Sequence, residues 1–142
     1  MNPLVSVIVP TYNSESTLQE CLSALVNQNY KNIEIIITDS FSRDKTKEIA
    51  RRFTKNIIDA ESLALARKKG VELAKGKYIL FLDSDQIIDT NTIELSVKAC
   101  EEEGLDGVTH FERSKIHKNT FVERLINYDK WIFHSEQDDD PI

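Results

Sequence analysis

Three short apolar runs constrain the fold of this chain more than any other feature of its sequence. They are rich in β-branched residues and cover Val5 to Val9, Ile33 to Thr38 and Tyr78 to Leu82. Each run is too short for a helix, and its continuous apolar character is typical of a strand buried on both faces of a sheet. Ile57-Ile58 predicts a further short strand between the second and third runs.

The segments between these runs have the apolar spacing of helices. A first helix is predicted to begin near Ser16, a second to have Asp44 as its N-cap, and a third to cover residues 62–74. Strands that alternate with helices imply right-handed βαβ crossovers, and therefore an α/β fold with a mainly parallel sheet flanked by helices. The stripe that should pack the first helix on the sheet consists of Leu18, Cys21, Leu22, Leu25 and Val26.

The last part of the chain continues this pattern. A helix over residues 91–103 is predicted to end at Gly104, and residues 107–111 are predicted to form another strand. Thr120-x-x-Glu123 has the form of a capping box and predicts an aromatic-rich helix that contains Tyr128 and Trp131.

Length, charge and cysteine content exclude several classes of protein. The 142 residues fit a single domain over residues 1–142, and the net charge of −6 disfavours a nucleic-acid partner. Cys21 and Cys100 have no zinc-binding spacing and are expected to be buried and reduced. No apolar stretch approaches the roughly 20 residues of a transmembrane helix. We therefore expect a cytoplasmic protein, and the aromatic helix leaves a peripheral contact with the inner face of the membrane open.

Polar clusters follow each predicted strand. They are Pro10-Thr11-Tyr12-Asn13 after the first run, Asp39-Ser40 after the second, and Asp83-Ser84-Asp85 after the third. In parallel α/β sheets, ligands bind beyond the carboxyl ends of the strands. The three clusters are therefore expected to meet at one edge and to form a binding site there.

Asp83 and Asp85 are the candidate metal ligands. Two carboxylates at a strand end suit a hard divalent cation such as Mg²⁺ or Mn²⁺, which often also bridges to substrate phosphates. The sequence lacks both glycine-rich phosphate-binding motifs, so a bound diphosphate would need a metal to balance its charge. The alternative for these aspartates is a solvated acidic turn.

Four motifs in this order resemble those of the family 2 glycosyltransferases, which have the Rossmann-like GT-A fold. Val9-Pro10-Thr11-Tyr12-Asn13 is similar to the family's V-P-x-Y-N, and Asp39 to Asp44 is similar to its Asp-Asp-Gly-Ser-x-Asp. Ala66 to Gly70 resembles A-R-N-x-G, and Ala74 to Gln86 resembles A-x-G-x-Y-I-x-F-L-D-x-D-D. The resemblance covers nearly the whole chain.

This resemblance implies a function and a set of roles. The expected reaction moves a sugar from a UDP- or GDP-linked donor to a hydroxyl acceptor, with inversion and with a divalent metal. The Pro10 to Asn13 segment would line the nucleotide pocket, and Asp39 would accept a hydrogen bond from the base. Arg67 would approach the base or phosphates, Asp83 the ribose and metal, and Asp85 the metal.

The sequence also departs from the family's pattern. Ser40, Phe41, Lys68 and Gln86 replace an aspartate, a glycine, an asparagine and an acidic residue of the motifs. The family's downstream Glu-Asp pair, which supplies the base that activates the acceptor, and its Gln-x-x-Arg-Trp element are not found. The catalytic base is therefore unknown, and a C-terminal truncation before these elements is one explanation.

Other functions also fit part of this sequence. Phe81-Leu82-Asp83-Ser84-Asp85 also resembles the Asp-x-Asp of haloacid dehalogenase-like phosphatases, although that motif usually lies on the first strand. A non-catalytic nucleotide-binding module is a third hypothesis. For single residues, Thr11, Asn13 and Asp39 have a capping interpretation, and Arg67 has the interpretation of a solvated basic residue beside Lys68.

Overall fold

The structure is a computed structural model that describes residues 2–110. The chain divides into two compact units, residues 1–108 and 109–142, and the description below concerns the first. Among the described residues, no helix has the length and apolar character needed to cross a membrane. In chain order the elements are β1 (Val5–Thr11), α1 (Leu18–Val26), β2 (Ile33–Asp39), α2 (Thr46–Ala50), β3 (Ile57–Asp59), α3 (Leu63–Leu73), β4 (Tyr78–Phe81) and α4 (Thr92–Glu103).

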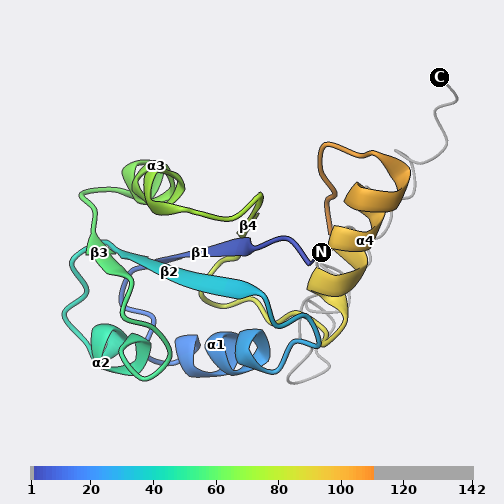
Figure 1. Cartoon of the computed structure of the whole chain (residues 1–142). Helices are drawn as coiled ribbons and strands as arrows, with labels where there is room; N and C mark the ends of the chain where they lie inside the picture. The colour runs from blue at the N-terminus through green and yellow to red at the C-terminus, as the bar shows by residue number, and fades with distance from the viewer. Residues whose placement is uncertain (1, 111–142) are drawn as a thin grey trace, which may run out of the picture. The chain divides into compact units, whose positions relative to one another are not determined.

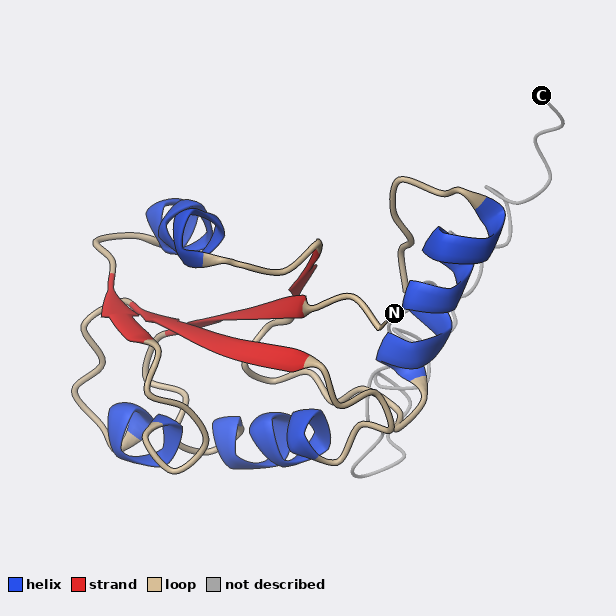
Figure 2. Cartoon of the chain, in the orientation of Figure 1, coloured by secondary structure: helices blue, strands red, loops and turns tan. Residues whose placement is uncertain are grey.

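Within residues 2–110, the strands form one parallel sheet in the order β3-β2-β1-β4. β1 pairs with β2 along its whole length, from Val5 opposite Ile33 to Thr11 opposite Asp39. Its pairing with the shorter β4 ends at Ile8, which lies opposite Phe81. Figure 2 shows the strands as a single layer with helices on both sides. The predicted parallel α/β sheet is confirmed.

The strand order explains which face each helix covers. The chain moves across the sheet in one direction from β1 through β2 to β3, and it then returns past β1 to form β4. Because βαβ crossovers are right-handed, this reversal places α3 on the face opposite α1 and α2. Figure 1 shows α1 and α2 below the sheet and α3 above it. Neighbouring strands β1 and β4 therefore flank a topological switch point, where sheets of this kind bind ligands.

The hydrophobic core explains the continuous apolar runs. All seven residues of β1 are buried, because helices cover both faces of the sheet around it. The predicted stripe on α1 is confirmed for Leu18, Cys21, Leu22 and Leu25, which are buried. The prediction is wrong for Val26, which is 46% exposed and borders an open groove. The core also receives Ile93 and Val97 of α4, and both cysteines are buried and free.

Two glycines of the sequence motifs allow close packing. A Cβ atom at Gly70 would lie 2.5 Å from Cγ2 of the fully buried Ile8, so α3 approaches β1 closely only because this residue is glycine. A Cβ atom at Gly76 would lie 2.6 Å from the backbone nitrogen of Ser6. These two motif positions therefore serve the packing of the sheet.

Several predicted boundaries are shifted. Asp44 is not the N-cap of α2: the helix begins one residue later than predicted, after Lys45, and the Asp44 carboxylate accepts from the backbone N–H of Thr46 at 3.0 Å. Ser62 caps α3 by accepting from the N–H of Leu65, and Gly104 ends α4 with a φ of 69°.

The strand predicted over residues 107–111 is wrong for its described part, since residues 107–110 are irregular. Val108 is the only apolar residue of that part, which leaves too little apolar surface to form a buried strand. The predicted capping box at Thr120 and the helix after it lie outside the described residues.

Candidate functional site

The three polar clusters meet at the carboxyl edge of the sheet, as predicted. Thr11 at the end of β1, Asp39 at the end of β2 and Asp59 at the end of β3 lie in one row of the strand register. The backbone N–H of Leu82 donates to the carbonyl of Ile8, which places Asp83 just beyond the same edge. The ends of β2, β3 and β4 therefore bring Asp39, Asp59 and Asp83 to one rim.

Asp39 is held inside the rim by hydrogen bonds. Its side chain is fully buried, and its Oδ1 accepts from the hydroxyls of Thr11 at 2.8 Å and Ser42 at 2.6 Å. Its Oδ2 accepts from the backbone N–H of Ser42 at 2.8 Å. A buried carboxylate needs such donors to offset the loss of water. In this arrangement Asp39 fixes the loop after β2, and the buried Thr11 acts as one of its donors.

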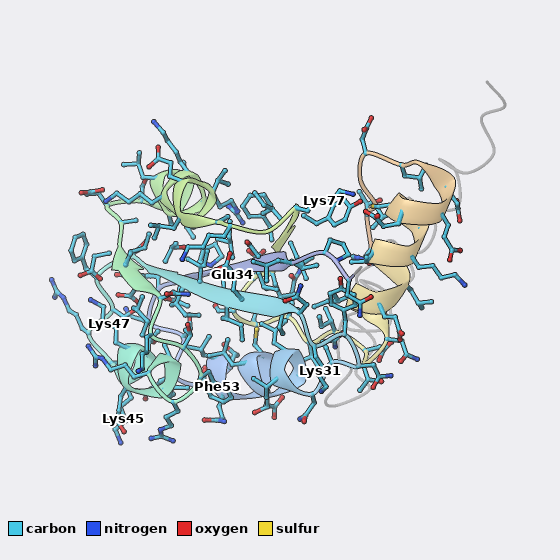
Figure 3. All side chains as sticks on the ribbon, viewed as in Figure 1. Lys31, Glu34, Lys45, Lys47, Phe53 and Lys77 are labelled. Carbon is cyan, nitrogen blue, oxygen red and sulfur yellow. The ribbon has the colours of Figure 1, made fainter. Side chains whose placement is uncertain are left out.

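Lys47 supplies the positive charge next to Asp39. Its Nζ lies 3.5 Å from Oδ2 of Asp39 and 2.5 Å from Oδ1 of Asp59, and the side chain lies at the α2 side of the sheet (Figure 3). The hydrogen bond that Lys47 donates to Asp59, and then the charge of Asp39, raise the pKa of Lys47 despite partial burial. Sequence reasoning missed Lys47 and Asp59. Asp59 follows Ile57-Ile58, so the rule applied to the other strand ends would have found it.

The loop after β1 is joined to the loop after β2. Asn13 has a φ of 47°, which asparagine tolerates, and its N–H donates to the Ser42 hydroxyl at 2.8 Å. Its side-chain oxygen accepts from the N–H of Arg43 at 2.9 Å. The N–H of Ser14 donates to the Thr46 hydroxyl at 2.7 Å. Asn13 therefore connects the two loops, while the neighbouring Tyr12 side chain is 62% exposed and available to a ligand.

Pro10 explains why the third cluster leaves the sheet. Residue 10 would be the next hydrogen-bond donor on the side of β1 that faces β4, and proline has no N–H. The chain after Leu82 is thus released into a loop, in which the N–H of Asp83 donates to the side chain of Gln86 at 2.9 Å. The hydroxyl of Ser84 lies 2.9 Å from that of Ser14, so this loop contacts the loop after β1.

Arg67 reaches this loop from the other face of the sheet. It lies on α3, and its Nη2 donates to Oδ1 of Asp83 at 2.9 Å. Both side chains are about half exposed, so solvent and ligands can reach the pair. The structure thus brings together five of the predicted site residues from three segments: Tyr12 and Asn13 after β1, Arg67 on α3, and Asp83 and Ser84 after β4.

Asp83 and Asp85 both act electrostatically on one buried thiol. Burial, and after it the charges of Asp85 and Asp83, together raise the pKa of Cys21 to about 12. The Cys21 thiol donates to the carbonyl of Asp83 at 3.7 Å. A thiol with this pKa stays protonated, which excludes Cys21 as a nucleophile or thiolate ligand near neutral pH.

The two aspartates fit a divalent metal that takes its remaining ligands from elsewhere. Both are exposed, and both offer the carboxylate oxygens that Mg²⁺ and Mn²⁺ prefer. Across residues 2–110, no group of three or more His, Cys, Asp or Glu side chains is arranged to hold a metal. A metal at this pair would therefore depend on water and on phosphate oxygens of a bound substrate.

Two hollows in the surface lie away from these aspartates. One of about 580 Å³ opens at the amino edge, between the start of β2 and the α2–β3 connection, near Lys31, Glu34 and Phe53 (Figure 3). The other, of about 420 Å³, is lined by Lys47, Arg51 and Asp59. Neither is lined by Asp83 or Asp85. The candidate site is thus a set of loops at an open rim.

The chain is similar in sequence to known proteins. The family described as "Glycosyl transferase family 2" matches residues 6–140. The glycosyltransferase GlyG of Streptococcus pneumoniae is 37% identical over 116 residues, which cover 76% of this chain and 38% of GlyG. The chain spans about two fifths or less of the length of the curated relatives it matches.

Solved structures share the fold. TarS 1-349 of S. aureus in complex with UDP-GlcNAc aligns with a TM-score of 0.67 at 25% identity, covering 79% of this chain and 38% of that one. The mannosyltransferase PcManGT of Pyrobaculum calidifontis, in complex with GDP-Man and Mn²⁺, aligns with a TM-score of 0.65 at 26% identity, covering 70% of this chain and 33% of that one.

Proposed function

Because the chain belongs to glycosyl transferase family 2, we propose that its carboxyl edge binds a nucleoside diphosphate sugar and presents the sugar for transfer to a hydroxyl acceptor. The observation that carries the proposal is the Arg67–Asp83 pair beside Asp85 at the switch point of the sheet. Cationic and metal-ligating groups there match the charge of a diphosphate. UDP or GDP is the proposed nucleotide, as in the complexes of TarS and PcManGT.

Asp83 and Asp85 are the proposed ligands of a divalent metal, Mg²⁺ or Mn²⁺. Such a metal supplies positive charge where negative charge develops on the departing diphosphate. Asp83 is also proposed to lie near the ribose. Both carboxylates are exposed and need no rearrangement of the core to receive a ligand.

Arg67 is the proposed diphosphate contact of the protein itself. In the structure its guanidinium is held by Asp83, which keeps the long side chain at the rim. A phosphate oxygen offers the same charge-assisted hydrogen bond as that carboxylate. With a divalent metal held by Asp83, the Arg67 guanidinium would be free to donate to the donor phosphates in place of that carboxylate.

The loops after β1 and β2 are the proposed base and ribose side of the site. Pro10, Thr11, Tyr12 and Asn13 shape this side, and Tyr12 is the member exposed to a ligand. Asp39 would accept from an N–H of the base if that N–H replaced the Ser42 hydroxyl as donor to Oδ1. Ser84, bonded to Ser14, is proposed to join this side to the metal side.

The acceptor half of the reaction is proposed from family membership alone. Inversion requires a carboxylate that deprotonates the acceptor on the face opposite the departing diphosphate. No described residue is assigned that role, and the catalytic base remains unknown. The phosphatase hypothesis loses its support, since the Asp83 motif follows β4, and not the first strand, in a glycosyltransferase-family chain.

Titration calorimetry with UDP and GDP, each with and without Mn²⁺, tests the proposal. The full chain is expected to bind one nucleotide in a Mn²⁺-dependent manner, and Asp85→Ala is expected to remove that dependence. Asp106→Ala, an exposed aspartate after α4, is the matched control and should leave binding unchanged. Metal-independent binding that Asp85→Ala does not alter would contradict the proposal. Sugar transfer or donor hydrolysis distinguishes an enzyme from a binding module.

A further inference from the structure

Phe41 occupies a backbone conformation that its side chain disfavours. Its φ is 58°, in the left-handed region where glycine and asparagine are at home and a bulky residue is an outlier. Strained residues of this kind persist where the surroundings impose them, and they gather at functional sites.

The hydrogen bonds around Asp39 impose this conformation. Ser42 donates both its N–H and its hydroxyl to the Asp39 carboxylate, which bends the chain sharply between residues 39 and 42. The N–H of Ser40 is fixed to the carbonyl of Thr11 at 2.8 Å. The Ser40 hydroxyl, in contrast, is a buried oxygen without a hydrogen-bond partner among the described residues. In this turn, Ser40 thus carries the cost of a buried hydroxyl without a partner, and Phe41 carries the cost of a strained backbone.

The turn presents the Phe41 ring to solvent at the rim of the site. The side chain is 54% exposed, so burial in the core does not explain its presence. The adjoining loop carries a second exposed ring, Tyr12, and the bond from Asn13 N–H to the Ser42 hydroxyl ties the two loops together. Two exposed aromatic residues therefore lie in connected loops above a buried carboxylate that can accept a hydrogen bond.

We propose that the ring of Phe41 packs against the planar base of the bound nucleotide. This inference rests on the proposed function and adds a base-binding residue to that site. An aromatic ring stacks on any base, whereas a hydrogen bond from a base N–H selects among bases. Phe41 would thus contribute affinity for the base, and the strain of its backbone is the stability that the protein gives up for that contact.

Calorimetry with UDP and with inorganic diphosphate, both with Mn²⁺, tests Phe41 on the full chain. Phe41→Asn removes the ring but accepts the left-handed φ, so its melting temperature should equal or exceed that of the wild type. UDP binding should weaken roughly ten-fold, which corresponds to the loss of one stacked base. Diphosphate binding should not change, because diphosphate has no base.

Two further variants separate the ring from the position. Phe41→Tyr keeps an aromatic face and should retain wild-type affinity for UDP. Leu95→Asn, at an exposed apolar residue of α4, should leave UDP affinity unchanged. If Phe41→Asn binds UDP with the same affinity as the wild type, the inference is overturned and the proposed function still stands. Absence of nucleotide binding in the wild type would overturn both.

Discussion

Arg67 on α3 and Asp83 after β4 form an ion pair at 2.9 Å, although α3 lies on one face of the sheet and β4 is a strand within it. The pair connects the crossover helix of one face to the loop that carries the proposed metal ligands. It holds a cation and a carboxylate at the switch point, two residues before Asp85 in the chain, before any donor is bound. The pair is half exposed, so its significance lies in ligand binding and its contribution to stability is small.

Arg67→Ala should therefore weaken nucleotide binding without destabilising the fold. We expect affinity for UDP or GDP with Mn²⁺ to fall about ten-fold or more, since one charge-assisted contact to phosphate is lost. The free energy of unfolding should change by less than about 1 kcal/mol. Arg52→Ala, which removes an exposed arginine paired with Glu48 on α2, is the control for both measurements. Equal nucleotide affinity in wild type and Arg67→Ala would exclude the phosphate contact.

Lys47→Met should destabilise the protein by about 1–2 kcal/mol, because it leaves the buried Asp39 carboxylate without its cation. The folded-state pKa of Lys47 is raised, so the stabilising charge is fully present below the ordinary lysine value of 10.5. Urea unfolding should thus give the same difference between wild type and variant at pH 7 and pH 9. The difference should shrink only as the pH rises above 10.5 through the folded-state pKa. A difference that falls already between pH 7 and pH 9 would contradict this assignment.

Gly70→Ala should destabilise the fold through a steric clash. The added methyl group meets Ile8 in the centre of the sheet, and overpacking of this kind costs about 1–3 kcal/mol. Gly107→Ala is the matched control, because no atom lies within 4 Å of a Cβ placed there. Thermal unfolding of both variants measures the effect. Similar melting temperatures for the two would show that α3 can move away from β1.

Much of the fold could be predicted because it depends on local patterns. The continuous apolar runs that begin at Val5, Ile33 and Tyr78 predict strands covered on both faces of a sheet. The helical spacing between these runs predicts βαβ crossovers that connect the strands. Those two requirements place Asp39 and Asp83 at one edge by topology alone. The strand predicted over residues 107–111 is wrong in its described part, residues 107–110. The single apolar residue there, Val108, has no apolar neighbours in that part with which to form a buried strand.

The internal chemistry of the site could not be predicted, because its partners are distant in sequence. Asp39 is buried by bonds to Thr11, 28 positions away, and by the charge of Lys47. A sequence pattern shows a carboxylate at a strand end, but it does not show whether that carboxylate faces a ligand or the loop beside it. The left-handed φ of Phe41 is likewise a consequence of bonds made by its neighbours.

The central claim is that one site at the carboxyl edge receives both nucleotide and metal, and the paramagnetism of Mn²⁺ tests it directly. In a ¹H–¹⁵N correlation spectrum of the full chain with UDP or GDP, substoichiometric Mn²⁺ should broaden the amide signals of residues 12–13 and 83–86. Signals of residues 31–34 and 52–56, around the groove at the amino edge, should remain sharp. Broadening confined to the amino edge, with the signals of Asp83 and Asp85 unaffected, would contradict the account.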